Sequence, residues 1–166
     1  MLPNFYEGIS MNYDAEMEKR EVEFGQMPPQ QFLLGLLSAF DNRYQAVADR
    51  LIGEITWKQF FAIICISICK EPPTLNELSD VMESSHQNVK QILLKLESKG
   101  FVSMVQDEKD KRKQRVAVTD KCREFCAKND DLSRQAVNAI FEGIDEKDLL
   151  VTIKTIMQME RNLKNI

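Results

Sequence analysis

The amino-acid sequence predicts a mainly α-helical (α+β) chain in which a single β-hairpin interrupts a series of helices. Apolar residues recur at helical spacing over most of the 166 residues, and polar capping residues precede several of these runs. Two short stretches, 101–106 and 115–118, are typical of strands. The residues between them, 107–114, are all polar or charged, so we expect them to form a long hairpin tip.

The composition is that of one compact domain with an extension. Of the residues, 43% are hydrophobic and 29% are charged, which excludes the disordered, collagenous and disulfide-rich classes. The longest apolar run, residues 60–66, is far shorter than the roughly 20 residues of a membrane span. The N-terminus lacks the basic and apolar regions of a secretion signal. We therefore expect a soluble, cytoplasmic protein without membrane association.

The first half of the sequence predicts an N-terminal extension followed by two helices. Residues 12–24 favour a short acidic helix within an N-terminal extension of 29 residues. This extension is either an extra packing helix or a disordered tail. Apolar positions at helical spacing predict a helix over residues 30–52. Thr56 is a candidate N-cap for a second helix that reaches about residue 70. This second helix is apolar nearly all round, so it should be buried on most sides.

Two shorter helices follow, joined by a tight turn. Thr74 and Glu77 form the sequence pattern of a capping box, which predicts a helix start. After a turn at residues 83–85, a helix is predicted to begin at His86 and to end before Gly100. One side of this second helix is apolar and should be buried: Val89, Ile92, Leu93 and Leu96.

The last third of the chain predicts two amphipathic helices. Thr119 caps a long helix that reaches about residue 141, and Asp145 begins a final helix. Both carry wide apolar stripes, and a short final helix has little to cover its stripe within one chain. This pattern favours association with a second copy.

Two short helices followed by a charged hairpin are the arrangement of a winged helix-turn-helix. The chain has a net charge of −4, yet residues 84–121 carry nine Lys or Arg against five Asp or Glu, a net +4. Basic charge gathered in one segment of an acidic protein predicts contact with a polyanion there. The alternative is a solvated basic face with no ligand.

The second short helix is narrow enough to enter the major groove of double-stranded DNA. Gln and Asn pair with adenine, and Lys donates to guanine, whereas Arg in a wing favours the narrower minor groove. The alternative is a polar, solvated helix face beside an unstructured basic loop. The side chains that would make these contacts are, at the helix start, His86, Gln87, Asn88, Lys90 and Gln91, and, in the wing, Lys111, Arg112, Lys113 and Arg115.

The cysteines form two pairs, Cys65/Cys69 and Cys122/Cys126. They favour core packing, with thiol-based sensing and a metal site as weaker alternatives. The single histidine, His86, excludes a His-rich metal site within one chain. We expect no metal and no cofactor. The sequence also lacks a Gly-rich phosphate loop, an H-E-x-x-H motif and a nucleophile elbow, so we expect no enzyme and no catalytic residues.

From about residue 32 to 163 the chain resembles the MarR family of bacterial winged-helix regulators. The resemblance rests on Ile55-Thr-Trp-Lys-Gln-Phe60, on Thr74-Leu-Asn-Glu-Leu78 and on Leu96-Glu-Ser-Lys-Gly-Phe-Val102. The wing sequence Asp110-Lys-Arg-Lys-Gln-Arg115 is similar to the family's D-x-R-D-x-R, followed by a strand that ends in Val118-Thr119. Four residues depart from the family pattern: Gln91, Leu94, Lys113 and Cys122.

The resemblance implies a homodimer that binds a pseudo-palindromic double-stranded DNA operator, with repression as the expected outcome. It implies that Arg112 enters the minor groove. Asp110 and Arg115 would pair to shape the wing, or Arg115 would contact a phosphate. Ser84, Ser85 and Lys90 would contact phosphates, while Ser85 and the helix start (residues 86, 87, 88 and 91) would contact bases. The implied divisions are an extension (1–29), a first dimerisation helix (30–54), a DNA-binding lobe (55–121) and C-terminal dimerisation helices (122–166).

Family members commonly release DNA when a small aromatic or anionic effector binds. The side chains that would line such a pocket, or that simply belong to the core, are Phe40, Arg43, Tyr44, Trp57, Phe60 and Phe61. Two other functions remain open at this point. One is a protein-interaction module that has kept the winged fold without operator binding, and the other is a regulator that responds to oxidants through its cysteines.

Overall fold

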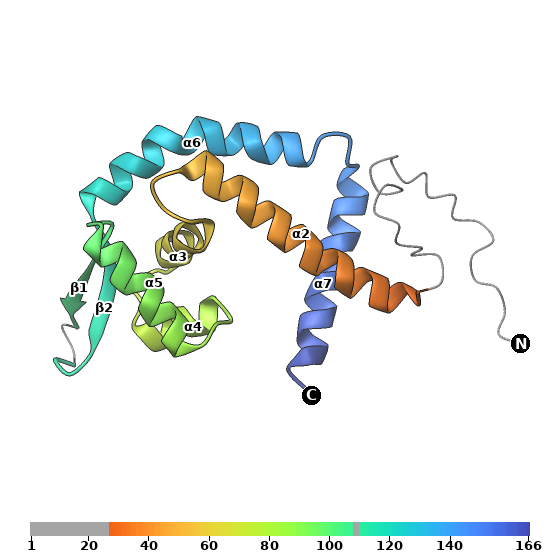
Figure 1. The fold of residues 1–166 in the computed structure, drawn as a ribbon. Coiled ribbons are helices and arrows are strands. Elements are labelled where there is room, and N and C mark those ends of the chain that lie inside the picture. The colour runs from red at the N-terminus through yellow and green to blue at the C-terminus, as the bar shows by residue number, and fades with distance from the viewer. Residues whose placement is uncertain (1–26, 108–109) are drawn as a thin grey trace, which may run out of the picture. The chain divides into compact units, whose positions relative to one another are not determined.

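The structure is a computed structural model that describes residues 27–107 and 110–166 (Figure 1). Its contacts divide the chain into two compact units, residues 1–46 and 47–166, and each is described by itself. The acidic helix predicted over residues 12–24 lies outside the described residues.

Helix α2 (Pro29–Ile52) agrees with the predicted helix over residues 30–52. Pro29 stands at the first helical position, where the missing N–H costs no hydrogen bond and the fixed φ suits a helix. The helix ends where Gly53 adopts a φ of 70°, and the Gly53 N–H donates to the Asp49 carbonyl at 3.0 Å. A residue without Cβ takes this left-handed conformation without strain, so Gly53 defines the helix end.

Three helices of the second unit begin at polar N-caps, two of which the sequence predicts. Helix α3 (Trp57–Ile68) starts with a capping box between Thr56 and Gln59, and it ends two residues before the predicted residue 70 because Cys69 is extended. Helix α4 (Leu75–Val81) starts with the predicted box between Thr74 and Glu77. Helix α5 (His86–Ser98) has Ser85 as its N-cap.

The hairpin consists of strands β1 (Val102–Gln106) and β2 (Gln114–Val118), paired antiparallel from Val102↔Val118 to Gln106↔Gln114. A two-stranded ribbon is marginal on its own and needs packing against another element. Here the segment before α4 supplies it: Thr74 forms a bridge with Arg115, and the Val116 N–H donates to the Pro73 carbonyl at 2.8 Å. Strand β1 also packs on α5.

The hydrophobic core lies among α3, α4, α5 and the hairpin, and it reaches the start of α6 (Asp120–Ile140). Phe101, directly after α5, is fully buried and meets Phe125 of α6 edge to face, with ring centroids 5.1 Å apart. Burial of this kind contributes about 1.5–3 kcal/mol for each large apolar side chain. The most completely buried members are Ala62, Leu78, Val89, Leu96, Phe101 and Val116. The predicted mainly α-helical winged helix-turn-helix is therefore confirmed.

Helices α6 and α7 (Glu146–Leu163) carry large apolar side chains that are exposed in the described part of the chain. In α6 the buried residues are Cys122 and Phe125, both near its start, and α7 has no buried residue. Exposed large apolar side chains of this region include Leu132, Val137, Phe141, Leu150, Ile153 and Met157. The predicted division of the chain into dimerisation and DNA-binding segments stays a prediction.

No single helix within residues 27–107 and 110–166 is long and apolar enough to cross a membrane; α2 and α3 satisfy the test of length and composition only when taken together as a bent pair.

Candidate nucleic-acid interface

The start of α5 presents a row of exposed polar side chains. The Ser85 hydroxyl accepts a hydrogen bond from the Asn88 N–H at 3.3 Å, and the Asn88 amide donates to the Ser84 hydroxyl at 2.8 Å. These bonds fix the first turn, while the apolar stripe on the other side of the helix is buried in the core. The predicted contact residues Ser85, His86, Gln87, Asn88, Lys90 and Gln91 are all exposed, and Ser84 is half-buried.

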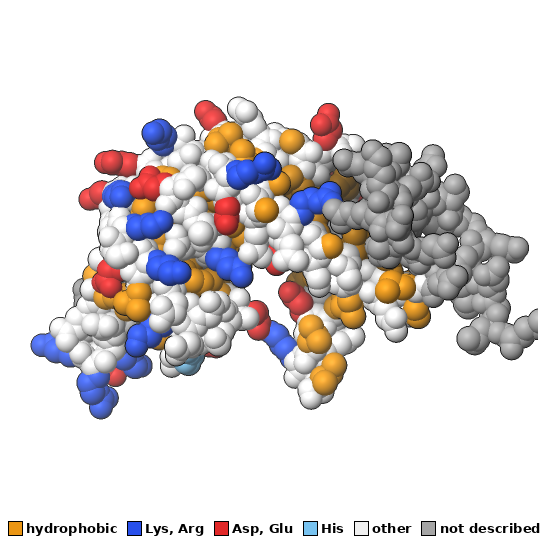
Figure 2. Space-filling model, in the orientation of Figure 1, with side chains coloured by type: hydrophobic (Ala, Val, Ile, Leu, Met, Phe, Trp, Pro, Cys, Tyr) orange, Lys and Arg blue, Asp and Glu red, His pale blue; other side chains and the backbone are white. Residues whose placement is uncertain are grey.

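The wing tip carries the predicted cations and holds one of them in place. The Asp110 carboxylate accepts hydrogen bonds from the Arg112 backbone N–H and from its Nε, both at 3.1 Å. This Arg112 hydrogen bond lowers the pKa of Asp110. The Arg112 side chain is 91% exposed, and Lys111 and Lys113 beside it are also exposed. Figure 2 shows Lys and Arg side chains projecting from this end of the hairpin.

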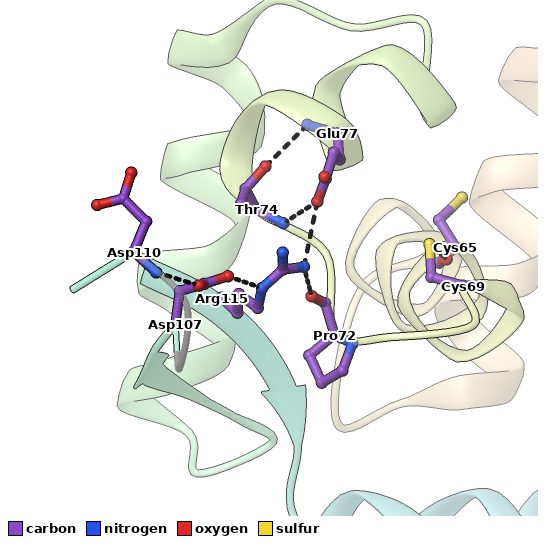
Figure 3. Close-up of polar contacts among 8 residues, drawn as sticks. All are labelled: Cys65, Cys69, Pro72, Thr74, Glu77, Asp107, Asp110 and Arg115. Atoms are coloured by element: carbon purple, nitrogen blue, oxygen red, sulfur yellow. Dashed lines mark hydrogen bonds and ion pairs between the residues drawn. The ribbon is translucent and has the colours of Figure 1, made fainter. Parts of the chain in front are cut away.

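Arg115 connects the wing to the segment before α4 (Figure 3). Its Nε donates to the carboxylate of Asp107, which is 6% exposed. Its Nη1 donates to the Pro72 carbonyl at 2.7 Å and lies 3.5 Å from a Glu77 carboxylate oxygen. The hydrogen bond to Asp107 raises the pKa of Arg115 further above its usual value. We call Asp107, Arg115, Pro72, Thr74 and Glu77 the wing anchor.

The predicted ion pair between Asp110 and Arg115 is wrong. Arg115 lies opposite Val105 in the hairpin, so the residue just beyond the end of β1, Asp107, meets its guanidinium. Asp110 lies in the turn and binds Arg112 instead. The sequence analysis does not identify Asp107 as the partner of Arg115. Asp107 comes directly after the predicted strand, and its position indicates the pair once the strand register is known.

Asp107 also shapes the turn itself. Its second carboxylate oxygen accepts a hydrogen bond from the Asp110 N–H at 2.7 Å, and the Asp107 N–H donates to the Lys113 carbonyl at 3.0 Å. One buried carboxylate thus contacts both the Arg115 guanidinium and the backbone of the tip. Such charge-assisted hydrogen bonds are about twice as strong as neutral ones.

Glu77 takes part in the wing anchor and in the cap of α4 at the same time. Its carboxylate accepts from the Thr74 N–H at 2.7 Å, while the Glu77 N–H donates to the Thr74 hydroxyl at 3.3 Å. The backbone hydrogen bond from Thr74 is the largest cause of a lowered pKa at Glu77, and the Arg115 charge lowers it further. The helix start and the wing therefore share one carboxylate.

The cysteines lie where the predicted core packing places them. Cys65 and Cys122 are buried, and Cys69 and Cys126 are half-buried. Burial raises the pKa of Cys65, and burial together with Cys126 raises the pKa of Cys122 to about 12. Thiols of this kind are poor nucleophiles at neutral pH. In the described part of the chain, no three side chains of His, Cys, Asp or Glu are grouped to hold a metal ion.

The predicted effector-pocket residues are divided between the two compact units. Phe40 and Tyr44 stack within the first, with centroids 5.9 Å apart, and Arg43 lies between them in sequence. In the second, Trp57 contacts Phe60 at 6.1 Å and Phe61 at 6.0 Å. Each group is a local cluster of rings, and the pocket stays a prediction.

Comparison with known proteins matches this lobe to a family. The model of the MarR family matches residues 55–113, which span α3, α4, α5, β1 and most of the hairpin turn. The HTH-type transcriptional regulator YkoM of Bacillus subtilis (strain 168), described as uncharacterized, is 26% identical over 126 residues, which is 72% of this chain and 82% of that protein.

Solved structures share the fold at low sequence identity. A MarR/EmrR family transcriptional regulator from Acinetobacter sp. ADP1 gives a TM-score of 0.75 at 13% identity, covering 84% of this chain and 100% of that one. The S. aureus MepR–DNA complex gives a TM-score of 0.69 at 14% identity, covering 77% of this chain and 94% of the other.

The raised thiol pKa values predict unreactive cysteines in the folded protein. At pH 8 we expect both Cys65 and Cys122 to react with iodoacetamide more slowly in the native protein than in urea. For Cys122, whose pKa is raised to about 12, the native rate should be more than about tenfold lower, because one pKa unit changes the thiolate fraction tenfold. Mass spectrometry of timed samples measures the rate at each residue. Native rates equal to or above those in urea would support the alternative of thiol-based sensing.

The lowered pKa of Glu77 predicts a pH-dependent contribution to stability. A carboxyl group with a lower pKa in the folded state stabilises that state above its unfolded pKa, and the contribution is lost as the pH falls through the folded value. Gln keeps the capping hydrogen bond without the charge, so Glu77→Gln should lower stability by about 0.5 kcal/mol at pH 7. In thermal unfolding series from pH 7 to pH 3, the difference from the wild type should become smaller as the pH falls. A difference that stays constant would show that the Glu77 charge has no role.

Proposed function

We propose that this chain, whose residues 55–113 match the model of the MarR family, is a sequence-specific, double-stranded-DNA-binding transcriptional regulator of that family. The observation that carries the proposal is the pairing of two exposed surfaces on one lobe. One is the polar start of α5, and the other is the cationic wing tip held beside it by the wing anchor. A solved relative of the same fold, MepR of S. aureus, is a complex with DNA.

The roles of the side chains follow from their positions. Gln87, Asn88 and Gln91, with Ser85 and His86, contact base edges in the major groove, since they are exposed at the start of a helix fixed by its buried face. Lys90 and the hydroxyls of the turn contact phosphates. Arg112 enters the minor groove, with Lys111 and Lys113 on the flanking phosphates.

Asp110 and Arg115 act on the wing rather than on bases. Asp110 orients Arg112 through two hydrogen bonds to one carboxylate oxygen. The Arg115 side chain is only 23% exposed, and its guanidinium contacts Asp107, the Pro72 carbonyl and Glu77. We therefore assign Arg115 to positioning the wing.

The active form is a homodimer on a pseudo-palindromic operator. The exposed apolar surface of α6 and α7 supports this, because no residue of α7 is buried among the residues that the structure describes, and a second copy would cover that surface. Repression in the cytoplasm, relieved by a small aromatic or anionic effector, is the regulatory form that we propose. The local clusters around Tyr44 and Trp57 are the candidate effector contacts.

Selection from a pool of randomised duplexes at two salt concentrations tests the function. We expect enrichment of an inverted repeat with half-sites about one helical turn apart, and steep loss of binding at the higher salt. No enrichment at either salt would contradict operator binding and would favour a winged-helix module that contacts proteins.

Two variants separate positioning contacts from base contacts on the selected operator. Arg112→Ala should weaken binding to operator and random duplexes alike. Gln87→Ala should change the preference at one base pair by about 1–3 kcal/mol, because a lost base contact affects only the base that it contacts. Fluorescence anisotropy on a set of single-base operator variants measures both. Equal effects of both variants on operator and random DNA would contradict the assignment of Gln87.

A further inference from the structure

A groove with a volume of about 1070 Å³ lies between α5 and the hairpin. Its floor is apolar and is formed by Leu75 of α4, Leu93 and Leu94 of α5, and Met104 of β1. The cations Lys90, Lys111, Arg112 and Lys113 line it as well. The groove thus connects the two surfaces that we assign to DNA binding. It is also lined by apolar side chains to which the proposed function gives no role.

Leu94 is the unusual member of this set. Of the exposed residues of α5, a helix that the structure describes throughout, Leu94 alone is apolar, and it is 48% exposed. It follows Lys90 by four residues, so both side chains lie on the same face of the helix. An apolar side chain on that face lies outside the buried stripe of α5, and it is available to contact a ligand in the groove.

The geometry of a DNA duplex specifies what passes through this groove. A major groove and the minor groove next to it are separated by one sugar–phosphate strand. If α5 enters the first and the wing enters the second, that strand must cross the space between α5 and the hairpin. Such a strand is apolar on its deoxyribose faces and anionic at its phosphates, which matches an apolar floor lined by cations.

We propose that this groove seats the sugar–phosphate strand between the two DNA grooves, with Leu94 and Met104 against deoxyribose and Lys90 on a phosphate. The inference rests on the proposed function and adds a contact surface to it. Leu94 thereby adds affinity for any duplex and does not select a base.

Two carboxylates also line the groove and affect the path of the strand. Glu77 contacts the Arg115 guanidinium, which offsets its charge. Glu97 lies nearly two helical turns beyond Lys90 on α5 and repels phosphates. The strand therefore crosses near Lys90, and Glu97 marks the end of the groove that it avoids.

The test compares variants of the groove on the selected operator and on a random duplex. Leu94→Gln should weaken both by about fivefold, because contact with deoxyribose is lost whatever the sequence. Lys90→Ala should lower the slope of log K against log salt by about one. Glu97→Gln should tighten binding to both duplexes by about twofold. Val81→Ala, which removes apolar surface that is also exposed but lies on α4 outside the groove, is the matched control and should change neither.

Each contrary result has a definite meaning. If the wild type binds no duplex, the proposed function fails and this inference fails with it. If the wild type binds but Leu94→Gln binds equally well, the inference alone is overturned. It is also overturned by the following pair of results: Leu94→Gln weakens binding to the operator only, and replacing thymine by uracil in the operator abolishes the difference in affinity between Leu94→Gln and the wild type. Leu94 would then contact a thymine methyl group and not deoxyribose. Glu97→Gln also serves as a control for misfolding, because a variant that binds DNA more tightly cannot have lost its structure.

Discussion

The ion pair between Asp107 and Arg115 is the contact on which the geometry of the interface depends. A hairpin of two five-residue strands has too little surface to hold its own orientation. The buried Asp107 carboxylate binds the Arg115 guanidinium and the backbone of the wing tip, and the guanidinium binds the Pro72 carbonyl. Because Pro72 lies two residues before the cap of α4, this ion pair helps to fix the wing to the helix-turn-helix, next to the Thr74 bridge and the hydrogen bond from Val116 to Pro73.

The electrostatics of the lobe follow from this arrangement. Asp107, Asp110 and Glu77 each contact an arginine, so their negative charges are offset locally. Lys111 and Lys113 remain exposed at the tip. A chain with a net charge of −4 thus presents a cationic surface where the helix start and the wing come together, and the attraction to a polyanion there should weaken with salt.

The helices were predictable because their signals are local. Thr56, Thr74, Thr119 and Asp145 each cap the helix that the sequence predicts after them, since a cap needs only a hydrogen bond within three residues. The exposed row at the start of α5 followed from periodicity in the same way.

The wing anchor was less predictable because its contacts are distant in sequence. Arg115 reaches a carbonyl 43 residues away, and its carboxylate partner depends on the strand register, which the sequence does not specify. The family resemblance alone offers Asp110 or a phosphate as the partner of Arg115, and it does not indicate Asp107. The groove between α5 and the hairpin likewise appears only when the register and the helix face are both known.

A double-mutant cycle on operator affinity, with Asp107→Asn and Arg112→Ala made singly and together, tests whether the Asp107–Arg115 ion pair acts on DNA binding through the wing. Removing a negative charge beside DNA would by simple Coulomb attraction tighten binding. We expect the opposite, weaker binding by Asp107→Asn, because the wing loses its orientation. We also expect little further loss when Arg112 is already absent. Tighter binding by Asp107→Asn, or strictly additive losses in the double variant, would contradict an anchor that acts through the wing.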